Sequence, residues 1–141
     1  MVARSRGEAH PTPWSRYAAT ADHAAVPQVV FTDPAVAAMG LSEDAARAAG
    51  HDVDVAEYPM GQVAAAALFV DGYTGHAKLV VDPGRRVLLG ATFVGPGAGE
   101  LLHAATIAVV GEVSVDRLWH AVPSFPTVSE VWLRLLEAYG L

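Results

Sequence analysis

The chain has 141 residues, the length of one ordinary domain, of which 52% are hydrophobic and 17% charged, and its net charge is −6. This composition excludes a disordered chain, which would be polar and rich in charge. The hydrophobic excess indicates that some apolar surface meets a partner. The nine basic residues are scattered, which argues against nucleic-acid binding. The longest apolar run, residues 63–70, is too short to span a membrane.

The sequence contains no cysteine. Disulfides, thiolate nucleophiles and zinc–thiolate sites are therefore excluded from this chain. A chain without cysteine does not require an oxidising compartment, and the first residues lack the hydrophobic centre of a signal peptide. We therefore expect a cytoplasmic protein.

The first part of the chain predicts short elements. Residues 1–25 are rich in Ala, Ser, Pro and His without a clear period, so we expect a mobile arm there. A β-branched and aromatic run over residues 27–34 predicts a strand. Residues 41–51 predict a helix in which Ser42 is the N-cap and Gly50 the stop.

The middle of the chain predicts a sheet. Residues 51–60 alternate in polarity and predict a strand with one solvated face, whereas residues 61–75 predict an irregular segment with one helical turn. Residues 76–83 and 85–96 predict an antiparallel hairpin. Its turn, residues 82–85, predicts type II geometry, because proline presets φ at the second position and glycine supplies a positive φ at the third.

Three helices are expected in the last third. Residues 98–112 are apolar almost all round, which predicts a helix buried between layers. Ser114 begins a short helix, and the last helix runs from its predicted cap Ser129, through the first-turn acid Glu130, to the stop at Gly140. Strands and helices are partly segregated along the chain, so the predicted fold class is α+β, an antiparallel β-sheet covered by helices.

Two groups of residues are ambiguous as sites. The glycine cluster over residues 95–99 follows a strand and opens a helix, where a dinucleotide fingerprint would lie, but Glu100 stands at the sixth position and no βαβ unit precedes it. The cluster is more typical of a tight strand-to-helix turn. The six histidines lack the spacing of a helical metal site, and a metal or small-molecule site built on His103, Glu100 or His120 stays an alternative.

Residues 120–130, His-Ala-Val-Pro-Ser-Phe-Pro-Thr-Val-Ser-Glu, form the most informative stretch. Two prolines stiffen the approach to the last helix. Glu130 stands at the start of that helix, where an acidic side chain complements the helix dipole.

Three stretches together carry a family resemblance: residues 26–50, 75–105 and 122–132. In order and spacing they resemble the C-terminal dimerisation (interface) domain of the FAD-dependent pyridine nucleotide-disulfide oxidoreductases, such as dihydrolipoamide dehydrogenase, glutathione reductase and mercuric reductase. The resemblance implies that residues 26–141 are a homodimerisation domain with that family's fold. It also implies that residues 1–25 are the remnant of a linker from a flavin-binding domain.

The resemblance assigns roles to the loop before the last helix. In the family a His-Pro-Thr-x-Ser-Glu loop lies against the flavin and disulfide of the partner subunit, with the His as acid–base residue and the Glu orienting it. Glu130 is then the expected dyad acid, and Phe125, Pro126 and Thr127 are the expected contacts to the partner's flavin edge. Phe125 replaces the His and cannot exchange a proton. The acid–base step is therefore absent, or another group such as His120 performs it.

The resemblance also implies that the chemistry lies elsewhere. In the family it belongs to the flavin and the redox cysteines, which sit in domains that this chain lacks. We expect the chain alone to be inert and to hold no cofactor or metal. Its parent would be a homodimeric oxidoreductase with FAD and NAD(P) domains in the same chain, of undetermined substrate. The alternatives are a free-standing small-molecule- or metal-binding α+β module, and an enzyme that binds flavin or metal by this domain alone.

Overall fold

The computed structural model describes residues 25–141, so the arm expected over residues 1–25 lies outside the described residues except for Ala25, and it stays a prediction. The strands are β1 (Gln28–Val30), β2 (Val36–Gly40), β3 (Asp54–Pro59), β4 (His76–Asp82) and β5 (Val87–Val94). They form one antiparallel sheet in the order β1-β2-β5-β4-β3. The helices are α1 (Glu43–Ala48), α2 (Ala66–Phe69), α3 (Ala98–Val110), α4 (Val115–Leu118) and α5 (Glu130–Tyr139), with a 3-10 turn η2 (Met60–Gln62). The predicted α+β class is confirmed.

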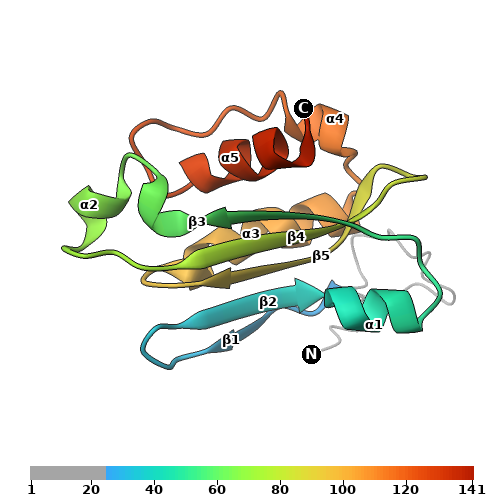
Figure 1. Ribbon diagram of the computed structural model, residues 1–141, viewed down its shortest axis with the longest axis horizontal. Coiled ribbons are helices and arrows are strands. Elements are labelled where there is room, and N and C mark those ends of the chain that lie inside the picture. The colour runs from blue at the N-terminus through green and yellow to red at the C-terminus, as the bar shows by residue number, and fades with distance from the viewer. Residues whose placement is uncertain (1–24) are drawn as a thin grey trace, which may run out of the picture.

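The two long helices share one face of the sheet. α3 packs along β2 and β5, and α5 packs along β3 and β4 (Figure 1). The core between them is apolar, and Phe93 of β5 is fully buried at its centre, with its ring 5.5 Å from that of Trp132. Removal of this apolar surface from water is the main stabilising contribution. No helix among residues 25–141 has the length and hydrophobicity that crossing a membrane would require.

The opposite face of the sheet is covered only in part. Ala46 of α1 packs there against Val53 and Val80. Beyond α1 the face is polar, because Glu57 and Lys78 lie opposite each other on neighbouring strands and form an ion pair of 3.0 Å. This arrangement confirms the solvated face that was predicted for residues 51–60.

Strand β2 was not predicted. Its sequence, Val-Ala-Ala-Met-Gly, is rich in alanine, which is depleted in strands. β2 nevertheless pairs with β1 on one side and β5 on the other, so backbone pairing and burial override the weak local preference. The first predicted strand is correspondingly shorter than expected, Gln28–Val30.

The turn between β4 and β5 differs from its prediction. The residue with positive φ is Arg86 (55°) rather than Gly84. Asp82 pairs with Val87, so four residues form the loop. The Asp82 carboxylate accepts hydrogen bonds of 2.9 Å from the backbone N–H groups of Gly84 and Arg85. The type II prediction is therefore wrong, because this side chain organises a longer turn.

Helix α3 is buried on one face only. Leu101, Leu102 and Ala105 face the sheet, whereas Ile107 and Val110 are exposed. The prediction of a helix enclosed between layers is wrong for the described chain, because only one layer contacts the helix. On its outer face Ala104, Ile107 and Val110 are exposed together with Glu100 and His103.

Candidate functional site

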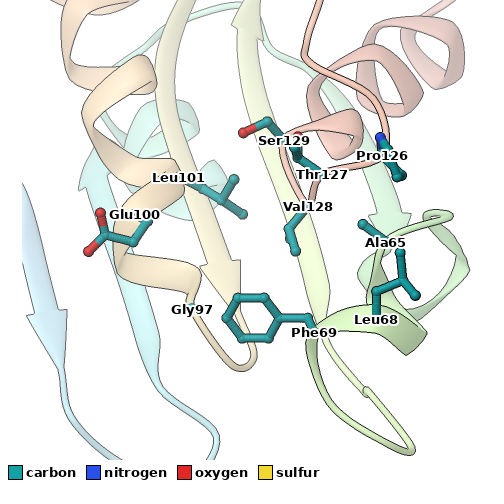
Figure 2. Close-up of a pocket in the computed structure, with 10 residues that line it drawn as sticks. All are labelled: Ala65, Leu68, Phe69, Gly97, Glu100, Leu101, Pro126, Thr127, Val128 and Ser129. Atoms are coloured by element: carbon teal, nitrogen blue, oxygen red, sulfur yellow. The ribbon is translucent and has the colours of Figure 1, made fainter.

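A groove lies where α2, the start of α3 and the loop before α5 meet (Figure 2). Its volume is about 330 Å³, at the lower end of the range for small-ligand pockets. The walls are mostly apolar and include Leu68, Phe69, Gly97, Leu101, Pro126 and Val128. The groove therefore joins three segments that are far apart in the sequence.

Phe69 closes the groove against the start of α3, and Figure 2 shows its ring beside Gly97. Gly97 has a φ of 73°, and a Cβ there would lie only 2.7 Å from the Phe69 ring. Phe69 also meets Tyr73 edge-on at 6.0 Å, and the Tyr73 hydroxyl donates a hydrogen bond of 2.8 Å to the Pro96 carbonyl. Burial raises the pKa of Tyr73. The glycine cluster thus forms the predicted tight turn, and Phe69 packs where a nucleotide phosphate would approach the helix.

The loop before α5 presents side chains outward. Phe125 is 75% exposed and Val122 is 84% exposed. The Thr127 hydroxyl donates a hydrogen bond of 2.6 Å to the Ser124 carbonyl, which stabilises the turn of the loop. Phe125 therefore contributes little to the core of this chain and is accessible to another molecule.

Glu130 is the only buried polar or charged residue among residues 25–141. Its Oε1 accepts hydrogen bonds from Arg134 Nη2 (2.7 Å) and Nε (3.0 Å), and its Oε2 accepts one from the Ala64 backbone N–H (3.0 Å). A carboxylate offers about four acceptor positions, so most of this one is occupied. Glu137, followed by Glu130, raises the pKa of Arg134 above its usual range by accepting hydrogen bonds from its guanidinium.

The structure separates the other candidate residues. Glu100 lines the groove, but its carboxylate points away from Phe69 (Figure 2). His103 and His120 are exposed. Within the described part of the chain, no three His, Asp or Glu side chains are grouped to hold a metal ion.

Sequence reasoning missed the α2 wall of the groove. The apolar run Leu68-Phe69-Val70 is exposed, and it lies between Gly61 and Gly72 in the segment that was predicted to be irregular. An apolar run in a short irregular segment was the available signal. The i,i+4 spacing of Glu130 and Arg134 could also have predicted their pairing.

The chain is similar to known proteins over most of its length. The family model described as "Pyridine nucleotide-disulphide oxidoreductase, dimerisation domain" matches residues 26–136. A dihydrolipoyl dehydrogenase from Thermus scotoductus is 40% identical over 113 residues, which are 80% of this chain and 24% of that protein. A mercuric reductase from Staphylococcus aureus is 36% identical over 105 residues, which are 74% of this chain and 19% of that protein. The chain thus spans a quarter or less of the length of these relatives.

Solved structures share the fold. The HOCl-induced flavoprotein disulfide reductase RclA from Escherichia coli matches with a TM-score of 0.74 and 25% identity, over 79% of this chain and 26% of that chain. LpdA from Mycobacterium tuberculosis matches with a TM-score of 0.78 and 22% identity, over 87% of this chain and 27% of that chain.

Proposed function

The chain belongs to the pyridine nucleotide-disulphide oxidoreductase family as its dimerisation domain, and from that premise we propose that it forms the homodimer of an FAD- and NAD(P)H-dependent oxidoreductase. The observation that carries the proposal is the outer face of α3, where Ile107 and Val110 are exposed. The exposed polar residues of this helix are Glu100 and His103, which lie in its first half. An uncovered apolar helix face favours association, because a partner removes it from water.

The test is the oligomeric state in solution. Light scattering after size-exclusion chromatography should give a dimer at micromolar concentration. Ile107→Asp places a charge on the proposed interface and should shift the chain towards monomer. Ala45→Asp is the matched control, because Ala45 is exposed on α1 at the opposite face of the sheet. A wild-type chain that stays monomeric over the whole concentration range contradicts the proposal.

We further propose that Phe125, Pro126 and Thr127 contact the flavin edge of the partner subunit in the assembled enzyme. The exposure of Phe125 supports this placement, because an accessible aromatic ring can stack on another ring system. FAD would supply the redox chemistry, while this loop would shape and shield one side of the site. A phenylalanine donates no proton, so the acid–base step, where the reaction needs one, belongs to another group.

The proton assignment is tested in a full-length enzyme that contains this domain. Phe125→His introduces a group that titrates near neutral pH. The pH dependence of kcat/KM for a disulfide substrate should therefore change. An unchanged profile means that position 125 does not approach the reacting atoms.

The cytoplasmic location remains a proposal from the sequence and from the absence of cysteine.

A further inference from the structure

We propose that Glu130 is a positioning residue whose carboxylate clamps the segment entering α2 to the loop before α5 and so fixes the two walls of the groove. Pro126 and Val128, which form one wall, precede Glu130 by four and two residues. Leu68 and Phe69, which form the opposite wall, follow Ala64 by four and five residues. The hydrogen bond from Ala64 to Glu130 therefore links the chain segment that carries one wall to the segment that carries the other.

The α2 segment is anchored at its start, where Val63, Ala65 and Ala66 are buried, and depends on few attachments beyond it. The helix has four residues, its N-cap residue makes no side-chain capping hydrogen bond, and Leu68 is largely exposed. Phe69 holds one end of the segment through Tyr73 and Gly97. The Glu130 carboxylate holds the other end through the Ala64 backbone.

A carboxylate is suited to this role because it can accept from several donors at once. Burying it unpaired would be costly, and Arg134 compensates its charge through two hydrogen bonds to Oε1. Oε2 is then left for the Ala64 N–H, and a hydrogen bond to a charged acceptor is stronger than one between neutral groups. A neutral amide at position 130 has a single acceptor oxygen and cannot satisfy both sides.

The clamp is intramolecular and needs neither a second copy nor a flavin. Its failure and the failure of the proposed dimerisation are therefore distinguishable. A monomeric chain could keep the clamp, and a dimer could lack it.

The experiment is amide hydrogen exchange by NMR on the 141-residue chain. In Glu130→Gln the carbonyl oxygen should stay with the guanidinium, the stronger donor, and the side-chain NH₂ should face the Ala64 N–H. Exchange at Ala64 should then accelerate by about tenfold or more, while amides of β4 and β5 stay within about twofold of wild type. Glu137→Gln is the matched control, because Glu137 also binds Arg134 (2.8 Å), whereas the Ala64 N–H donates to Glu130.

Two results would overturn the proposal. One is Ala64 exchange in Glu130→Gln within twofold of wild type. The other is a uniform acceleration across the sheet, which would make Glu130 a contributor to global stability only. Glu130→Ala gives a second measurement: nuclear Overhauser contacts between Phe69 and Val128 should weaken, and unchanged contacts would also overturn the clamp.

Discussion

Two helices of this chain begin with the same pattern, Ser-Glu-x-x-x-Arg, at residues 42–47 and 129–134, but the pattern serves them differently. At α1 the Ser42 hydroxyl accepts a hydrogen bond of 3.2 Å from the Ala45 N–H, as an N-cap should. At α5, Ser129 already has helical φ and ψ (−61° and −15°), and its side chain accepts no capping hydrogen bond. The sequence prediction of a cap is confirmed at α1 and wrong at α5.

The two glutamates differ more than the two serines. Glu43 lies on the open face of the sheet and pairs with Lys78 (2.6 Å) and Arg47 (3.0 Å). Lys78, and then Arg47, lowers the pKa of Glu43 by donating hydrogen bonds to its carboxylate. Glu130 forms the equivalent i,i+4 pair but is buried and also accepts from a backbone donor. The i,i+4 spacing thus determines that the two side chains pair, and the tertiary surroundings determine what the pair contributes to stability and function.

Truncating the two glutamates should give the largest difference in the free energy of unfolding between changes at the start of α5 and at the start of α1. Glu130→Ala leaves the Ala64 N–H without its acceptor and leaves the partly buried Arg134 paired with Glu137 alone, so we expect a loss of about 1–3 kcal/mol in the free energy of unfolding. Glu43→Ala should cost clearly less, because water replaces its contacts. Urea denaturation of both variants measures the difference. Equal losses would mean that burial of Glu130 has no energetic consequence.

Truncating the two serines should give the opposite ranking, with the larger loss of stability at α1. Ser42→Ala removes a capping hydrogen bond and should lower the free energy of unfolding by about 1 kcal/mol. Ser129→Ala removes no such bond and should have a much smaller effect. The same urea titrations test this expectation. A larger effect at Ser129 would show that its hydroxyl caps α5 in solution.

Much of the fold was predictable because local signals agreed with it. The hairpin and the strand β3 follow from alternating polarity, and α1 follows from its cap and its glycine stop. Strand β2 was missed because its alanines carry no strand signal and only its neighbours in the sheet specify it. Glycine in the β4–β5 turn misled the prediction, because Asp82 imposed a longer loop with the positive φ at Arg86.

The candidate site was predictable in its residues more than in its contacts. The loop over residues 122–130 stood out from its prolines and from the resemblance. The hydrogen bond between Glu130 and Ala64 spans 66 positions of the chain, and no local pattern encodes such a contact. The exposed outer face of α3 was also unforeseen, because a helix that is apolar all round has the same sequence whether its second face meets another layer or a partner.

The smallest predicted effect concerns the pH dependence at the open α1 face. Hydrogen bonds from Lys78 lower the pKa values of both Glu43 and Glu57 from their ordinary value of 4.5. A carboxylate with a lowered folded-state pKa stabilises the fold at pH values above its unfolded-state pKa, and this contribution is lost as the pH falls through the folded-state value. The chain should therefore lose stability as the pH drops below about 4.5, since that is the ordinary value.

Replacing the shared cation tests this dependence. Lys78→Met removes the main cause of both lowered pKa values, so the decline in the free energy of unfolding between neutral and acidic pH should become shallower. High salt should have the same direction of effect in the wild type, because these groups are partly exposed to solvent and salt screens their attraction. Arg85→Met is the control, since Arg85 pairs with Glu112 and forms no ion pair with Glu43 or Glu57. If the decline in Lys78→Met is as steep as in the wild type and the control, other carboxylates govern acid unfolding, and the open-face ion pairs contribute nothing measurable to it.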